Sequence, residues 1–162
     1  MNLPKRKTPR IPGYDYSKNG SYFITICTQN KEQLFGPVGA DSISARMIAR
    51  TFIETVQKFP QVKSPVFKVM PNHFHAILTI ERADMESAPT VSRVVQEFKR
   101  YSTLAYIKLV ENGQVPAFQG KIWQRSFHDR IIRNDREYEE IWKYIRYNDQ
   151  KWDADCFYPK NR

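Results

Sequence analysis

The most constraining feature of the sequence is a pair of short apolar runs joined by Pro71-Asn72. Residues 66–70 and His73–Ile80 both have strand composition, and the proline and asparagine between them favour a tight turn. Strands with so short a connection pair as an antiparallel hairpin. Because alternate side chains of a strand point to opposite faces, one face of the second run carries an unbroken apolar row: Phe74, Ala76, Leu78 and Ile80. This hairpin predicts a sheet with one face buried against a core.

The other predicted elements alternate around this hairpin. Residues 22–28 have strand composition, and residues 42–58 carry apolar side chains at helical spacing. After the hairpin we expect a long helix from Pro89-Thr90, a strand at 122–132, and a last helix capped by Asn134 or Asp135 that runs to about residue 148. This order predicts an α+β fold: a ferredoxin-like split β-α-β sandwich with a four-stranded antiparallel sheet, plus a C-terminal helix.

The charge balance predicts a polyanionic partner. Twenty-six Lys+Arg against seventeen Asp+Glu give a formal net charge of +9, and nucleic acid is the commonest such partner. We expect a basic N-terminal arm at 1–19 and a single catalytic domain at 20–162. In the arm, Arg10, Tyr14 and Tyr16 combine a cation with rings that can stack on bases; the alternative is a tail that is merely basic.

Composition also excludes several classes. Cys27 and Cys156 are too few and too far apart in sequence for a disulfide framework or a cysteine-based zinc site. No apolar run resembles a signal peptide or a membrane span. We therefore expect a cytoplasmic, nucleoid-associated protein with no membrane partner.

The histidines of the hairpin predict a metal site. His73 and His75 lie on the same face of their strand, opposite the apolar row, so both imidazoles can reach one metal ion. They are two of only three histidines in the chain. Two ordinary sheet histidines are the alternative.

A second candidate set lies on the last predicted helix. Tyr144 and Asn148 are four residues apart and so share a helical face. A phenol can attack phosphorus when a metal activates the phosphate, and an amide oxygen can complete a metal site. The alternatives are a packing tyrosine and a helix C-cap. Tyr101, one turn after Glu97, is the competing nucleophile.

Basic residues next to aromatic ones are typical of proteins that bind single-stranded nucleic acid. His128 shares a predicted strand face with Ser126 and Arg130, where it can touch DNA, support the metal site or serve only the structure. Each basic residue is also compatible with a solvated helix face. Besides the arm, the candidate nucleic-acid-binding residues are Lys99, Arg100, Arg125, His128, Lys143 and Arg146.

These residues resemble those of the single-tyrosine HUH transposases, specifically the REP-associated tyrosine transposases. The resemblance covers nearly the whole chain through short motifs in the same order: Gly13-Tyr14-Asp15-Tyr16-Ser17, Tyr22-Phe23-Ile24-Thr25-Ile26-Cys27-Thr28, Val69-Met70-Pro71-Asn72-His73-Phe74-His75, Phe98-Lys99, Trp123-Gln124-Arg125-Ser126-Phe127-His128-Asp129, Tyr144-Ile145-Arg146-Tyr147-Asn148 and Lys151-Trp152. The branch usually has proline at Asp149 and often a second histidine at Arg130.

The resemblance implies a role for each matched residue. His73 and His75 would be the HUH metal ligands, Asn148 the third ligand and Tyr144 the nucleophile, with Mg²⁺ or Mn²⁺ as the metal. The implied substrate is single-stranded DNA hairpins of REP-like palindromes, with a nearby tetranucleotide that the arm would read. Monomer and helix-swapped homodimer both occur among such proteins.

Two other functions remain open from the residues. A non-catalytic single-stranded nucleic-acid-binding domain on a ferredoxin-like sheet would need exposed aromatics on its strands and no metal. A structural zinc protein would need more ligands than the histidine pair.

Overall fold

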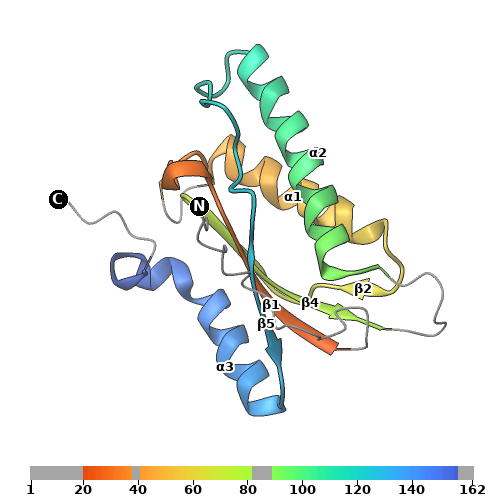
Figure 1. Cartoon of the computed structure of the whole chain (residues 1–162). Coiled ribbons are helices and arrows are strands. Elements are labelled where there is room, and N and C mark those ends of the chain that lie inside the picture. The colour runs from red at the N-terminus through yellow and green to blue at the C-terminus, as the bar shows by residue number, and fades with distance from the viewer. Residues whose placement is uncertain (1–19, 38–40, 82–88, 157–162) are drawn as a thin grey trace, which may run out of the picture.

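The computed structural model describes residues 20–37, 41–81 and 89–156 (Figure 1). The arm residues Arg10, Tyr14 and Tyr16 lie outside these ranges. In chain order, the helices and strands are β1 (Gly20–Cys27), η1 (Gln29–Lys31), α1 (Ile43–Gln57), β2 (Val62–Lys63), β3 (Phe67–Met70), β4 (His73–Ile80), α2 (Val91–Glu111), β5 (His128–Ile132), α3 (Asp135–Arg146) and η2 (Asn148–Ala154), where η marks a 3-10 helix.

The sheet has the strand order β2-β4-β1-β5, and β3 also pairs with β4. All of these pairs are antiparallel, and the β3–β4 register places Met70 opposite His73, as the predicted hairpin requires. β2 and β3 line the same edge of β4 at different points, so together they act as one interrupted edge strand. Counted in this way, the sheet confirms the predicted four-stranded ferredoxin-like arrangement.

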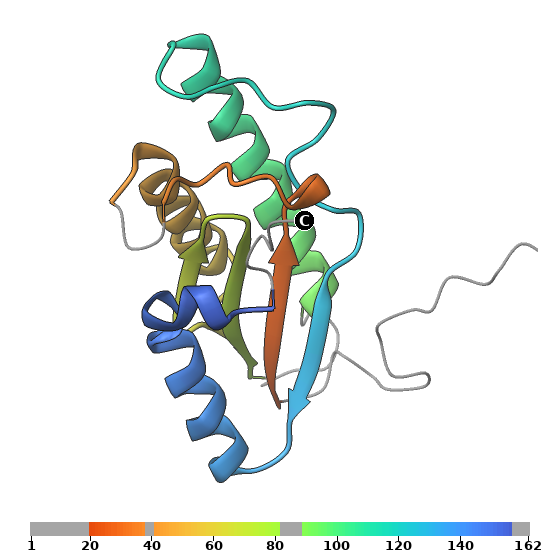
Figure 2. The same ribbon diagram turned by 90° about the vertical axis from the view of Figure 1, so that its left-hand side faces the viewer.

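Helices cover both faces of the sheet. α1 and α2 lie together on one face and α3 on the other (Figures 1 and 2). The larger apolar core lies under α1 and α2, and it includes the predicted row of β4. A smaller cluster of Val66, Ile77, Ile141 and Ile145 holds α3 against the opposite face. α3 therefore packs on the face that carries the two histidines.

Side-chain caps define where the three α-helices begin. Ser42 accepts a hydrogen bond from the Ala45 backbone N–H at 3.1 Å, and Thr90 accepts one from Arg93 at 3.1 Å. Asn134 accepts from the Glu137 N–H at 2.8 Å, so of the two predicted caps of α3 it is Asn134 that serves. Each cap satisfies a backbone donor that the first helical turn leaves unpaired.

Two predicted elements are shorter than expected. Of the strand predicted at 122–132, only His128–Ile132 joins the sheet, besides one isolated bridge between Trp123 and Thr28. The carbonyls of residues 124–126 instead accept hydrogen bonds from Lys99 Nζ, at 2.8 to 3.4 Å. The last helix ends at Arg146, and Asn148 opens η2. No helix in the three described ranges is long and apolar enough to cross a membrane.

Candidate active site

The histidine pair lies in the middle of the sheet. β1 places Thr25 opposite His75 and Cys27 opposite His73, so these four side chains share the face that α3 covers. The two imidazoles are 0% and 1% exposed, and their ring centroids are 4.5 Å apart. The predicted same-face arrangement is confirmed.

Polar neighbours orient both imidazoles. The Nδ1 of His73 lies 2.8 Å from the Asn72 amide oxygen, and the Nδ1 of His75 lies 2.8 Å from the Thr25 hydroxyl. With the amide oxygen accepting from Nδ1–H, the Nε2 of a neutral His73 carries the lone pair. Such a second hydrogen bond fixes the ring orientation of histidines that bind metals. Nothing in the sequence pattern assigned these roles to Asn72 and Thr25.

Burial keeps both histidines uncharged. It lowers the pKa of His73 to about 4, a shift that the nearby Asp155 carboxylate only partly opposes. Burial, and then the charge of His73, hold the pKa of His75 well below its usual value. Both rings are therefore neutral near pH 7, which is the form that binds metal ions.

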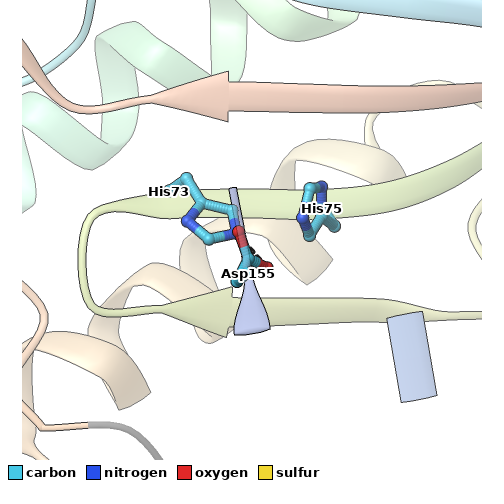
Figure 3. Close-up of side chains that lie close together, drawn as sticks. All are labelled: His73, His75 and Asp155. Atoms are coloured by element: carbon cyan, nitrogen blue, oxygen red, sulfur yellow. Dashed lines mark ion pairs between the residues drawn. The ribbon is translucent and has the colours of Figure 1, made fainter. Parts of the chain in front are cut away.

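Asp155 joins the histidines to form a three-residue cluster. One potential ligand atom from each of His73, His75 and Asp155 lies within 4.8 Å of the others, and all three residues are buried. In Figure 3 the two imidazoles project from β4 and Asp155 approaches them from the end of η2. Two imidazoles and one carboxylate fit a divalent transition-metal ion, although such a donor set does not select among metals.

Tyr144 lies directly beside this cluster. Its ring centroid is 5.4 Å from that of His75, and its hydroxyl donates to Asp155 Oδ2 at 3.4 Å. The side chain is 43% exposed, so a ligand can reach it from solvent. Burial, and then the negative charge of Asp155, raise the pKa of Tyr144 to about 12. The phenol is thus protonated near neutral pH and directed at a carboxylate.

Asn148 lies near the same cluster but is not on α3. It is 2% exposed, and its amide group opposes the rise in the pKa of Tyr144. An ion pair of 3.3 Å between Lys68 and Asp149, the position where relatives usually have proline, ties η2 to β3. The role of Asn148 as a metal ligand stays a prediction.

The competing nucleophile Tyr101 lies on α2, away from the histidines, on the helix pair that covers the opposite face of the sheet. Lys58 Nζ lies 3.4 Å from its ring centroid, and Arg100 donates to its hydroxyl at 3.0 Å. These cations lower the pKa of Tyr101. The structure therefore separates Tyr101 from the cluster and brings Tyr144 to it.

The remaining predicted nucleic-acid-binding residues are spread over several surfaces. Lys99 binds backbone carbonyls, as described above, and Arg100 forms an ion pair with Glu97. Arg125 lines a polar hollow at the end of β1, and His128 and Lys143 line hollows that Tyr144 also borders. Arg146 is exposed on α3. Contact of any of these residues with nucleic acid stays a prediction.

Asp155 is the residue that sequence reasoning missed. It belongs to no recognisable spacing with His73 or His75, from which it is eighty residues or more away in the chain. It reaches the histidines because η2 folds back over β3 and β4, where the Trp152 ring lies 5.8 Å from that of His73. Only the packing of this segment reveals the candidate ligand.

Fold and site together define a ferredoxin-like α+β domain with a candidate metal centre on its sheet and a tyrosine on the covering helix. The chain belongs to the IS200-like transposase family, whose family model, "Transposase IS200 like", matches residues 16–148.

Two relatives from Haemophilus influenzae match most of this chain. The chain is 29% identical to an uncharacterized protein from Haemophilus influenzae, covering 94% of this chain and 93% of that protein. It is 26% identical to a provisionally named REP-associated tyrosine transposase of the same organism, over 85% and 74% of the two chains.

Two solved structures share the fold. A REP-associated tyrosine transposase bound to a REP hairpin matches with a TM-score of 0.62 and 23% identity, over 88% of this chain and 74% of that one. A provisionally named transposase from Deinococcus radiodurans matches with a TM-score of 0.55 and 16% identity, over 85% and 95%.

Proposed function

We propose that this protein cuts and rejoins single-stranded DNA through a covalent bond to Tyr144, with a divalent metal ion held by His73, His75 and Asp155. The observation that carries the proposal is the position of the Tyr144 phenol, which contacts Asp155 and lies beside the buried histidine pair. A tyrosine that served only packing would not need its hydroxyl directed at a buried carboxylate beside a histidine pair.

The chain's own residues supply most of the proposed chemistry. The Tyr144 oxygen attacks the scissile phosphorus and loses its proton to solvent, which can reach this exposed side chain, while Asp155 Oδ2, 3.4 Å away, orients the phenol. The bond from phosphorus to the 3′-oxygen breaks, leaving a 5′-phosphotyrosine and, after protonation, a free 3′-hydroxyl. A 3′-hydroxyl that later attacks the phosphotyrosine restores a phosphodiester and returns the phenol, so rejoining needs no ATP.

A bound metal ion would supply positive charge at the scissile phosphate. When bound, Mn²⁺ or Mg²⁺ would polarise the phosphate and favour the ionised phenol. The buried histidines contribute by staying neutral and by being held in place through Asn72 and Thr25. Asn148 is a further oxygen donor for the same ion, as its match to the family motif implies.

The proposed substrate is a DNA hairpin with single-stranded flanks. This follows from the family and from the likeness to a REP-associated transposase that was solved with a REP hairpin. The net charge of +9 supports a polyanionic substrate. We propose that the basic arm at 1–19 contributes to reading the flank.

A non-catalytic binder of the RNA-recognition type is disfavoured by the position of α3. Such domains stack bases on aromatic side chains of an open sheet face. Here the face under α3 carries His73 and His75 at 0% and 1% exposure, and the opposite face is buried under α1 and α2. Both sheet faces are therefore largely covered.

Covalent trapping tests the proposed function directly. Purified protein is incubated with Mn²⁺ and single-stranded hairpin oligonucleotides copied from repeats beside its own gene, then separated on a denaturing gel. We expect a slower protein–DNA band that requires metal and is abolished in Tyr144→Phe, because the phenol oxygen forms the bond. Tyr147→Phe and Tyr101→Phe are matched controls that should retain the band. Persistence of the band in Tyr144→Phe would assign the chemistry to another tyrosine.

A further inference from the structure

A hollow of about 400 Å³ lies between β1, β5 and α3. We call it the Phe23 pocket; its main lining residues are Phe23, Thr25, His128, Arg130, Ile141 and Tyr144. Pockets that bury small organic ligands have volumes of about 300–1,000 Å³. The Phe23 pocket is thus large enough for one planar heterocycle.

Tyr144 borders two hollows. It lines the Phe23 pocket and also a hollow of about 720 Å³ that includes Asn148 and Asp155. A DNA strand with its scissile phosphate at the Tyr144 hydroxyl would therefore place a neighbouring nucleotide at the Phe23 pocket. No residue of this pocket other than Tyr144 has a part in the proposed bond-breaking.

The chemistry of the pocket fits a base better than a phosphate. The Phe23 and Tyr144 rings meet edge to face, with centroids 6.0 Å apart, and Ile141 adds apolar surface. Bases stack on such aromatic surfaces whatever their sequence. A phosphate would meet Glu140 at the rim, and the cation there, Arg130, is already paired with Glu137.

A polar group at the rim can read the edge of the base. His128 is exposed and pairs across the sheet with Thr25, whose hydroxyl contacts His75. A neutral imidazole offers one hydrogen-bond donor and one acceptor, which suits the mixed edge of a nucleobase.

We propose that the Phe23 pocket binds the nucleobase next to the scissile phosphate, with Phe23 stacking on it and His128 hydrogen-bonding to its edge. The inference rests on the proposed function and deepens it: Phe23 and His128 become specificity-determining residues for the cleavage site. Because the strand is held on both sides of the phosphate, the pocket also positions phosphorus for the phenol.

A binding measurement tests the pocket without requiring cleavage. The probe is the hairpin oligonucleotide of the trapping assay, and an abasic analogue replaces each nucleotide of its flank in turn. Affinity for Tyr144→Phe protein, which keeps the ring, is measured by fluorescence anisotropy with Mn²⁺ present. We expect one flank position at which the abasic analogue weakens binding about tenfold, the scale of one lost base–aromatic stack.

His128→Ala and Phe23→Leu, each added to the Tyr144→Phe protein, connect that position to the pocket. We expect His128→Ala to weaken binding of the intact strand about fivefold. In this variant the abasic analogue should lose less affinity than it does with the Tyr144→Phe protein, because the interaction between His128 and the base is already absent. His128 is exposed, so this variant should fold normally. Glu139→Ala, exposed on α3 and outside the pocket, is the matched control and should leave both values unchanged.

Two outcomes would overturn the inference. Either no flank position responds to the abasic analogue, or the response in both pocket variants is as large as in the Tyr144→Phe protein that carries neither substitution. Failure of the proposed function is a different result. It would appear as the absence of a covalent band with wild-type protein, while the affinity pattern would still show whether a base occupies the Phe23 pocket.

Discussion

At the residue scale, Asp155 connects the two halves of the candidate site. Its Oδ2 lies 3.9 Å from His73 Nε2 and 3.4 Å from the Tyr144 hydroxyl. Its negative charge raises the pKa of both groups, although burial is the larger cause for Tyr144 and outweighs it for His73. One carboxylate thus lies beside both a candidate metal ligand and the proposed nucleophile.

We predict that replacing Asp155 or His75 removes the response of the protein to metal. Mn²⁺ bound only by the folded protein raises the melting temperature in proportion to RT ln(1 + [L]/Kd). We expect a clear upward shift for wild type and at least about a tenfold weaker apparent affinity in both variants, since Asp155→Asn loses the carboxylate charge and His75→Ala loses an imidazole ligand. Thermal melts across a Mn²⁺ titration measure this.

The shift on adding metal, rather than the melting temperature itself, is the readout, because His75→Ala also leaves a cavity. Asn148→Ala discriminates the two candidate oxygen donors. A lost shift in Asn148→Ala with an intact one in Asp155→Asn would make Asn148 the ligand and Asp155 only a neighbour.

At the element scale, α3 supplies its tyrosine to the histidines of its own chain. The cluster of Val66, Ile77, Ile141 and Ile145 holds the helix on the sheet, and the Tyr144 and His75 rings contact within one chain. A complete candidate site therefore needs no exchange of helices between two molecules.

We predict that His75→Ala and Tyr144→Phe proteins do not complement each other. Two molecules that exchanged α3 would form one intact site from the mixture, whereas a site built within one chain stays broken in both variants. We expect covalent trapping of the equimolar mixture to stay at the background of each variant alone. Recovery of a substantial fraction of the wild-type band would show that helices are exchanged.

The backbone of the segment before β5 is held by hydrogen bonds from one lysine, Lys99. Lys99 Nζ donates to the carbonyls of Gln124, Arg125 and Ser126, which lie outside the strands. We predict that Lys99→Met lowers the free energy of unfolding by about 1–3 kcal/mol, because the carbonyls lose a charged donor. Urea denaturation measures the change.

Lys108→Met, exposed on the same helix, is the control and should change stability by less than about 0.5 kcal/mol. Equal stabilities of the Lys99 and Lys108 variants would contradict the structural role and favour the sequence-based prediction that Lys99 serves nucleic acid.

At the scale of the whole molecule, the buried histidines couple stability to pH. The pKa of His73 is about 4 in the folded protein, against an ordinary value of 6.5. As pH falls through this window the unfolded chain takes up a proton before the folded one does. The contribution of the neutral ring to stability is therefore complete above about pH 6.5 and decreases toward pH 4.

We predict that metal-free protein loses on the order of 2 kcal/mol of unfolding free energy between about pH 7.5 and about pH 5 through His73. Urea denaturation in a chelator, at about pH 7.5 and about pH 5, measures the slope. His73→Asn, which cannot titrate, should show a smaller difference between the two pH values. The same difference in both proteins would mean that other groups carry the pH dependence.

Local patterns in the sequence were sufficient to predict the sheet, the helices around it and the face that the two histidines share. The alternation in β4 fixed which face the two histidines share, because side chains of a strand alternate regardless of what packs on them. The turn at Pro71-Asn72 and the cap at Asn134 could be predicted because each depends only on residues that are neighbours in the sequence. The match of motifs to one transposase family came from the same short segments.

Tertiary structure alone decided the rest. Asp155 reaches the histidines because η2 folds back over the hairpin. No sequence pattern links Asp155 to His73 or His75, so this contact could not be predicted. β5 begins only at His128, and Lys99, on a distant helix, donates to the carbonyls of the segment before it. The motif match already implied Tyr144 as the nucleophile, but only the packing of the helices places Tyr144 beside His75 and α2, which carries Tyr101, on the other face of the sheet. Local rules set what each segment can form, whereas contacts between segments far apart in the chain set which side chains meet.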